Sequence, residues 1–270
     1  MERLEVKALA IGRFDGFHRG HTELFSYLGE GGALAVIKTN GLKITPNQKK
    51  FTNLEIFTYE LESIKDLSGE KFIDKLMEEF PNLKRIVVGY DFKFGKNRSF
   101  SAEDLKDLFS GEVVIVDEFK LNKTSVHTKE IKTLLKLGNI TKANNLLGRN
   151  FEILGKVIKG QGLGAKKLYP TINLEISNDQ FLPKDGVYLT YANFQDRRFK
   201  SLSFIGTRLS TDGKFSIETH ILEEFYSTPE FINLEFVEFL RDNAKFENLN
   251  DLKTQISKDI KRAKETLNER

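Results

Sequence analysis

The stretch IGRFDGFHRGH at residues 11–21 decides the fold of the first half of the chain, because an apolar run leads through a glycine-punctuated turn into a helical pattern. His18 and His21 lie three residues apart in it. At the start of a helix this spacing sends both side chains to one side, beside unpaired backbone N–H groups and the positive end of the helix dipole. Gly20 would let a phosphate approach the backbone. The stretch therefore predicts an anion site with two imidazole donors.

Strands and helices alternate outward from this motif. The patterns predict strands at residues 4–11, 33–37, 85–88 and 113–116, and helices at residues 19–28, 70–80 and 131–147. Such alternation is typical of βα units on a parallel sheet, which binds ligands at the carboxyl ends of its strands. We therefore expect an α/β, Rossmann-like domain over residues 1–148, closed by Gly148.

The character of the sequence changes beyond this point. Short β-patterned runs, separated by Gly, Pro and polar clusters, cover residues 151–158, 186–192, 198–205, 214–221 and 232–240. They predict an antiparallel β-barrel domain over residues 149–270. A helical pattern at residues 249–267 predicts a C-terminal helix that covers one opening of the barrel.

The composition excludes several classes of protein. Hydrophobic residues make up 39% and charged residues 30% of the 270 positions, which favours folded domains over disorder. The net charge of +3 gives no footprint for nucleic acid, and no apolar run reaches the roughly 18 to 20 residues of a membrane helix. The lack of cysteine excludes disulfides and zinc–thiolate sites. We expect a cytoplasmic monomer or weak homo-oligomer without nucleic-acid or membrane partners.

The amino-terminal motif resembles the GxFDGxHxGH form found in the flavin adenylyltransferase branch of the HxGH nucleotidyltransferase superfamily. The run VVGYDFKFGK at residues 87–96 is similar to a second hallmark of that branch, GxDFxFG. By this resemblance His18 and His21 bind ATP phosphates and stabilise the transition state while an FMN phosphate attacks the α-phosphorus. The resemblance implies further nucleotide contacts at Gly12, Phe14, Asp15 and Gly20. Asp91 is expected in the flavin or nucleotide pocket, and a turn aspartate is an equally good interpretation.

The segment HTKEIK at residues 127–132 departs from the SSTxIR segment of the same family. A hydroxyl at Thr128 and a cation at Lys132 remain, and both are expected to contact the nucleotide. Lysine offers a point charge where arginine offers a bidentate fork, which predicts a weaker grip on phosphate. A TFxPHP-like stretch after the second strand is also missing.

The second half of the chain carries a different phosphate motif, GQGLGAKKLYPTIN, at residues 160–173. Glycines allow backbone N–H groups to surround phosphate oxygens, and lysine neutralises them. The expected nucleotide contacts here are Gly160, Gly162, Gly164 and Lys166. Thr171 and Asn173 point to one face of an extended chain. A flexible hairpin and a turn capped by these two residues are the structural alternatives.

The PTIN run at residues 170–173 resembles the PTxN motif of riboflavin kinases. Similar landmarks follow in order: FLPKDGVY at 181–188, FIGTR at 204–208 and IETHI at 217–221. The resemblance implies that Thr171 and Asn173 hold Mg²⁺ with the ATP phosphates and that Glu218 is the catalytic base. Glu218 is expected on the strand face opposite Ile217 and Thr219. The run at residues 236–246 is similar to an FxxxLRxxxKF pattern of the same family, which implies that Arg241 lies near the flavin.

Together these resemblances imply a prokaryotic bifunctional riboflavin kinase/FMN adenylyltransferase, or FAD synthetase. Its ligands would be riboflavin, FMN, FAD, ATP and ADP, with Mg²⁺ as cofactor and ATP as co-substrate. The altered segment 127–132 leaves a second hypothesis, a riboflavin kinase whose nucleotidyltransferase domain is weakened or redirected. A third is a non-catalytic flavin or nucleotide sensor that uses the same pockets.

Overall fold

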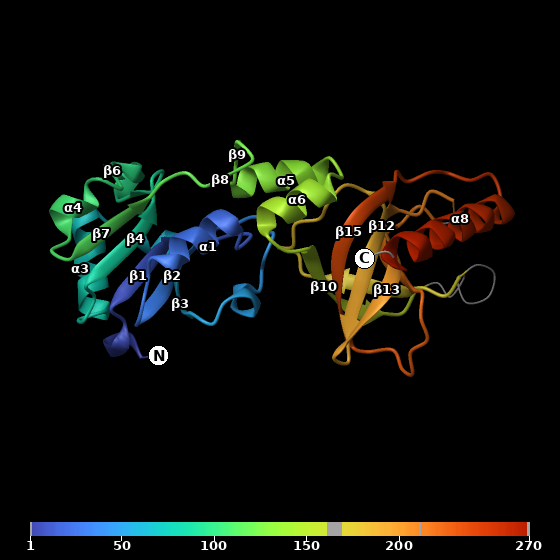
Figure 1. Cartoon of the computed structure of the whole chain (residues 1–270), viewed down its shortest axis with the longest axis horizontal. Coiled ribbons are helices and arrows are strands. Elements are labelled where there is room, and N and C mark those ends of the chain that lie inside the picture. Colours follow the sequence, from blue (N-terminus) through green and yellow to red (C-terminus); the bar gives the residue numbers. More distant parts are fainter. Residues whose placement is uncertain (1, 161–168, 211, 269–270) are drawn as a thin grey trace. The chain divides into compact units, whose positions relative to one another are not determined.

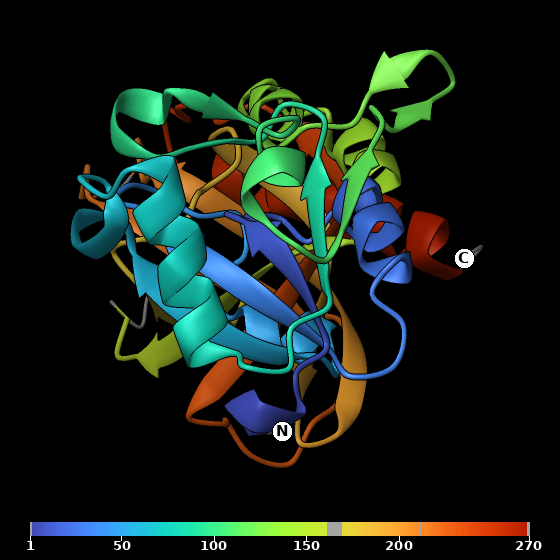
Figure 2. The same ribbon diagram turned by 90° about the vertical axis from the view of Figure 1, so that its left-hand side faces the viewer.

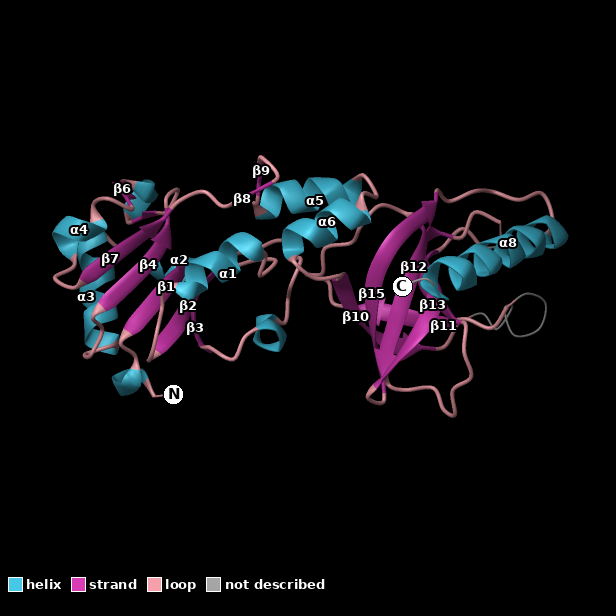
Figure 3. Cartoon of the chain, viewed as in Figure 1, coloured by secondary structure: helices cyan, strands magenta, loops and turns pink. Residues whose placement is uncertain are grey.

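The computed structural model describes residues 2–160, 169–210 and 212–268. The chain divides into two compact units, residues 1–130 and 131–270. One unit mixes helices and strands, and the other is mostly strand (Figure 3). The division expected after residue 148 rests on the change of sequence pattern and stays a prediction.

The amino-terminal unit is built on a parallel sheet with the strand order β3-β2-β1-β4-β7. These strands are β1 (Ala8–Gly12), β2 (Gly32–Lys38), β3 (Glu55–Glu60), β4 (Arg85–Gly89) and β7 (Glu112–Val116). Alternate residues of β1 enter two separate cores: Leu9 packs with helix α3 (Gly69–Glu79), and Ala10 packs with helix α1 (Arg19–Ser26). Figure 2 shows α3 lying across the strands. The predicted parallel α/β fold is confirmed.

The direction of chain progression through this sheet reverses between β1 and β4. The chain runs from β1 outward to β3, then returns to the other side of β1 with β4 and β7. Open α/β sheets bind ligands beside such a switch point, at the carboxyl ends of the strands. The loop after β1 holds the histidine motif, and the loop after β4 holds Tyr90 and Asp91.

Smaller elements complete this unit. They are η1 (Arg3–Glu5), η2 (Gln48–Phe51), α2 (Leu61–Ile64), β5 (Lys93–Phe94), η3 (Lys96–Arg98), β6 (Phe100–Ser101), α4 (Leu105–Leu108), β8 (Lys120–Leu121) and β9 (Thr124–Ser125). The strand expected from residue 4 begins only at Ala8, because the preceding residues form η1, in which the Glu5 carboxylate accepts the N–H of Glu2 at 2.9 Å. Strand β3 was not predicted. It lies at the sheet edge and is mostly half-exposed, so it lacks an apolar run.

Residues 131–147, expected as one helix, form parts of two: α5 (Thr128–Lys136) and α6 (Ile140–Leu147). The single-helix prediction was wrong because Gly138 adopts φ +76°, a left-handed conformation that ends a helix. Asn139 then begins α6 by accepting the N–H of Lys142 at 3.4 Å. The side chain of Asn144 anchors α6 to the barrel by donating to the Phe236 carbonyl at 2.8 Å.

The carboxy-terminal unit is a closed antiparallel barrel with the strand order β10-β11-β14-β13-β12-β15. These strands are β10 (Phe151–Ile158), β11 (Ile172–Ile176), β12 (Gly186–Phe194), β13 (Arg197–Thr207), β14 (Phe215–Ile221) and β15 (Phe231–Arg241). Tyr188 and Phe236 pack edge to face at 5.1 Å and are fully buried. The predicted barrel is confirmed. Strand β11 was not predicted as a strand, since the phosphate motif covers its beginning.

Helix α8 (Leu249–Asn268) ends the described chain (Figure 1). Its residues Ala263 and Leu267 pack with Val187, Leu202 and Val237, which belong to three barrel strands. The helix therefore lies against the wall of the barrel rather than over an opening. Within the described ranges no helix is long and apolar enough to cross a membrane.

Candidate functional sites

The first candidate site lies where β1 leads into α1. His18 caps the helix, because its Nδ1 accepts the backbone N–H of His21 at 3.3 Å. The two imidazole rings stack with centroids 3.5 Å apart, and Phe14 packs edge-on against His21 at 5.2 Å. The structure thus brings the two predicted histidines together at a helix N-terminus.

His21 is held as a neutral ring. Burial lowers its pKa well below 6.5, and the nearby His18 and His127 lower it further. Its Nδ1 is buried and finds no hydrogen-bond partner among the residues that the structure describes. A neutral imidazole carries one donor and one acceptor nitrogen, so a ligand group can complete this site.

The turn between β1 and α1 has an unusual backbone. Phe14 and Phe17 adopt φ values of 47° and 43°, although both side chains are buried. A side chain on Gly12 would lie 2.7 Å from the Phe14 ring, so glycine is required there. The amide of Gln48 donates to the carbonyl of Phe14 at 3.0 Å. Strained conformations of this kind are commonly found at functional sites.

Asp15, Gly20 and Thr128 hold this loop in place. The Asp15 carboxylate accepts the backbone N–H of Ile44 at 2.8 Å, and its carbonyl accepts the Thr128 hydroxyl at 2.7 Å. A side chain on Gly20 would meet the carbonyl of Val126 at 3.3 Å. These contacts shape the turn between β1 and α1, and direct nucleotide contacts by the three residues stay a prediction.

Two other residues were expected to contact the ligands of this site. Asp91 is exposed directly after β4. Lys132 lies in α5, and its ammonium nitrogen is 5.5 Å from the ring centroid of Phe181, within the carboxy-terminal unit. The flavin contact of Asp91 and the nucleotide contact of Lys132 stay predictions.

The second candidate site lies on the outer face of the barrel. Glu218 pairs with Asn173 across strands β14 and β11. Its neighbours Ile217 and Thr219 are 2% and 0% exposed, which confirms the predicted alternation of faces. The hydroxyl of Thr171 donates to Glu218 Oε2 at 3.1 Å. The structure thus brings Thr171, Asn173 and Glu218 together.

Two further groups hold the other carboxylate oxygen of Glu218. Arg208 donates to Oε1 from Nη1 at 3.2 Å, and the Ser216 hydroxyl donates to it at 3.0 Å. Arg208 also makes a bidentate pair with Asp212 at 2.9 and 2.8 Å. Sequence reasoning quoted Arg208 as a landmark without giving it this role. The available signal was an arginine at the end of that landmark, directly after β13.

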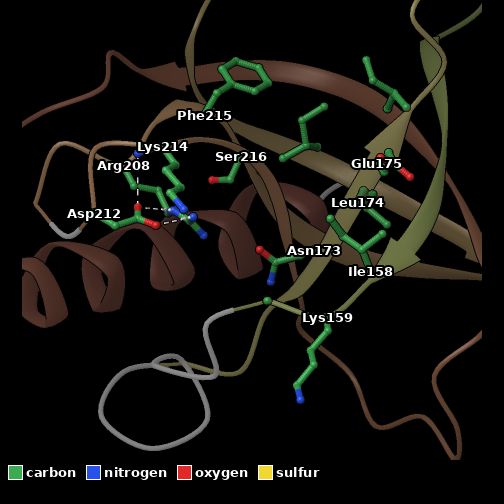
Figure 4. Close-up of a pocket in the computed structure, with 13 residues that line it drawn as sticks. Ile158, Lys159, Asn173, Leu174, Glu175, Arg208, Asp212, Lys214, Phe215 and Ser216 are labelled. Atoms are coloured by element: carbon green, nitrogen blue, oxygen red, sulfur yellow. Dashed lines mark hydrogen bonds and ion pairs between the residues drawn. The ribbon is translucent and has the colours of Figure 1, made fainter.

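A pocket of about 510 Å³ opens beside these groups (Figure 4). Its polar lining includes Asn173, Arg208 and Lys214, and Phe215 contributes apolar surface. Cations next to apolar surface suit a ligand that carries both phosphates and aromatic rings. Gly160 also lines the pocket. Gly162, Gly164 and Lys166 lie outside the described residues.

Gly160 leaves room for the side chain of Asn173. A Cβ atom at this position would lie 2.1 Å from Asn173 Nδ2.

Gly160→Ala is therefore expected to displace the Asn173 amide and to raise the KM for ATP in FMN formation about tenfold, as loss of support for a ligand group does. Steady-state kinetics at saturating riboflavin measures this. The double variant Gly160→Ala/Asn173→Ala should be no worse than Asn173→Ala alone; additive effects would contradict the proposed displacement.

Arg241, expected near the flavin, contacts helix α8, and its flavin contact stays a prediction. Its guanidinium binds the carboxylate of Asp259, which is 4% exposed, at 2.8 to 3.1 Å. Arg241→Met should lower the free energy of unfolding by about 3 kcal/mol, because it leaves the buried Asp259 carboxylate without its cation and with the amide of Gln255 as a donor at 2.9 Å. Urea unfolding measures this change. Arg262→Met is the control: Arg262 is exposed and lies 3.6 Å from Glu238, so an effect below about 0.5 kcal/mol is expected. Unchanged stability of Arg241→Met with a raised KM for riboflavin would favour flavin contact.

Both units of the chain match known protein families. A family model described as FAD synthetase matches residues 35–130, and one described as riboflavin kinase matches residues 147–267. A bifunctional riboflavin kinase/FMN adenylyltransferase of Buchnera aphidicola subsp. Schizaphis graminum is 31% identical, over 97% of this chain and 94% of its own length. The protein of the same name from Escherichia coli K12 is 25% identical over 95% and 91%.

One solved structure has the same fold throughout. It is a crystal structure from Streptococcus pneumoniae, described as a macrolide-efflux protein, with a TM-score of 0.86 and 25% identity. The match covers 96% of this chain and 94% of the other. The arrangement of a parallel α/β unit followed by a barrel is therefore shared along the whole chain.

Proposed function

Because this chain belongs to the family of bifunctional riboflavin kinase/FMN adenylyltransferases, we propose specific roles for its residues in the two reactions of that family. The chain uses ATP to phosphorylate riboflavin to FMN and to adenylylate FMN to FAD. The barrel carries the first reaction and the α/β unit the second.

In the barrel, Glu218 takes the proton from the terminal ribityl hydroxyl of riboflavin. That oxygen forms a bond to the γ-phosphorus of ATP, the bond from this phosphorus to the ADP oxygen breaks, and ADP leaves. Arg208 and Ser216 orient the carboxylate by donating to Oε1, and Oε2 accepts the Thr171 hydroxyl. Asn173 faces Glu218 in the register of the two strands. Three donors around one carboxylate are the observation that carries this assignment.

The donor set beside Glu218 fits Mg²⁺. The Thr171 hydroxyl gives its hydrogen to Glu218, so its oxygen lone pairs are directed elsewhere. Asn173 adds an amide oxygen, and hard cations prefer oxygen ligands supplemented by substrate phosphates. Thr171 and Asn173 would therefore hold Mg²⁺ together with ATP, where the ion supplies charge neutralisation of the phosphates.

In the α/β unit, an FMN phosphate oxygen attacks the α-phosphorus of ATP. The bond between the α- and β-phosphates breaks, and pyrophosphate leaves. His18 and His21 lie at the N-terminus of α1, where imidazole and backbone N–H groups stabilise the negative charge of this transition.

One incubation tests the two activities together. The purified chain with riboflavin, ATP and Mg²⁺ is expected to form FMN first and FAD later. Chromatography of the flavins at successive times measures both products. FMN without FAD would favour the kinase-only alternative. Flavin binding without either product would favour the sensor.

A further inference from the structure

A third histidine lies beside the imidazole pair of the amino-terminal unit. His127 immediately precedes α5, and its two chain neighbours touch the histidine motif. The carbonyl of Val126 lies against Gly20, 3.3 Å from the position of a Cβ there. The hydroxyl of Thr128 donates to the carbonyl of Asp15 at 2.7 Å. The backbone on either side of His127 therefore contacts the histidine motif and keeps His127 next to it.

The His127 ring is held by groups that follow the two adjacent strands β4 and β7. Its Nε2 lies 3.3 Å from Glu118 Oε1 and 3.4 Å from the hydroxyl of Tyr90. Within the described ranges, both hydrogen-bonding contacts of the ring are made by Nε2. A histidine oriented through one nitrogen presents the other to a ligand.

Glu118 is a charged partner for this ring. Hydrogen bonds from Lys120, Ser125 and His127 lower its pKa from 4.5 to about 2. The carboxylate is thus ionised throughout the neutral range. Its contact with Nε2 orients the ring, so that the opposite nitrogen can face an anion.

The surroundings of His127 fit a polyphosphate ligand. Its side chain is 39% exposed, so a ligand can reach it. It is close enough to His21 to lower the pKa of that ring, and His21 Nδ1 is buried without a partner among the described residues. Three imidazoles and the first turns of α1 and α5 thereby surround one region at the carboxyl ends of the strands.

We propose that His127 is a third phosphate-binding imidazole of the adenylyltransferase site, contacting the β- and γ-phosphates that leave as pyrophosphate, while Glu118 and Tyr90 position its ring. This inference rests on the proposed adenylyltransferase function. It assigns His127 to binding of the leaving group, whereas His18 and His21 act at the helix that faces the reacting phosphorus.

The test compares His127→Ala with the parent chain. Loss of one charge-assisted contact is expected to raise the KM for ATP in FAD formation from FMN about tenfold, with the KM for FMN changed less than twofold. His127→Gln retains an N–H donor and should recover part of this loss. Thr124→Ala, on the exposed neighbouring strand β9, is the matched control and should leave the KM unchanged. An unchanged KM for FMN shows that the α/β unit is folded, and riboflavin phosphorylation by each preparation shows the same for the barrel.

Direct binding separates this inference from the function on which it rests. Calorimetric titration of each full chain with pyrophosphate and Mg²⁺ should show about tenfold weaker binding for His127→Ala than for Thr124→Ala. Equal pyrophosphate affinities and an equal KM for ATP would overturn the role of His127. A parent chain that forms no FAD would contradict the adenylyltransferase function, and the pyrophosphate titration would still decide whether His127 binds phosphate.

Discussion

Replacement of Glu218 by Gln should lower the rate of FMN formation about 10³-fold, because a positioned general base contributes about 10² to 10⁴ in rate. The amide keeps the size of the side chain and an oxygen acceptor for Arg208 or Thr171, but it cannot take the ribityl proton. The kcat with riboflavin and saturating ATP measures the effect. Riboflavin binding, followed by quenching of flavin fluorescence, should remain within about threefold.

Glu224→Gln is the control for this change. Glu224 is exposed and follows β14. Its replacement by Gln removes the same charge and leaves the contacts of Thr171 and Arg208 unchanged. Its kcat should equal that of the parent. FMN formation by Glu218→Gln at the parental rate would exclude Glu218 as the base. An equal loss in both variants would point to net charge instead.

Replacement of His21 by Ala is expected to lower FAD formation from FMN about 10² to 10³-fold, as removal of a transition-state donor does. His21 contributes no side-chain cap to α1, since the cap comes from His18. The helix should therefore remain, and the loss should fall on kcat rather than on stability. The measurement is FAD release from FMN and ATP, with riboflavin phosphorylation by the same sample as the internal reference.

His18 needs a different replacement, because it has two roles. Its Nδ1 caps α1, so His18→Ala combines loss of the imidazole with a capping cost of about 1 kcal/mol. His18→Asn retains a cap acceptor and removes only the imidazole. Equal kcat losses in the Asn and Ala variants would indicate a chemical role. Full FAD formation by His18→Asn would show that capping alone matters.

The sequence predicted the strongly patterned parts of this structure well. The motif around His18 and the strand alternation around Glu218 could be placed because their surroundings have a clear apolar period. Strand β3 could not, since its half-exposed edge position gives it no apolar stripe. The break at Gly138 was missed because the helical spacing continues on both sides of it.

The candidate sites show the same limit. Local motifs identified Thr171, which directly precedes β11, and Glu218, which lies on β14; the two meet because β11 pairs with β14. The partners Arg208 and Glu118 come from other segments, and only the tertiary fold brings them to the site. The ion pair of Arg241 with Asp259 of α8 could not be predicted either, because the two residues lie 18 positions apart in different elements.

The central claim is that two separate phosphate sites, one in each unit, act in succession on the same flavin. A mixing experiment with Glu218→Gln and His21→Ala tests it most directly. Given riboflavin, ATP and Mg²⁺, the first variant alone should form no product and the second should stop at FMN. The two variants mixed should form FAD, because free FMN passes from one chain to the other. Absence of FAD from the mixture, with each chain folded and the parent active, would contradict two independent sites.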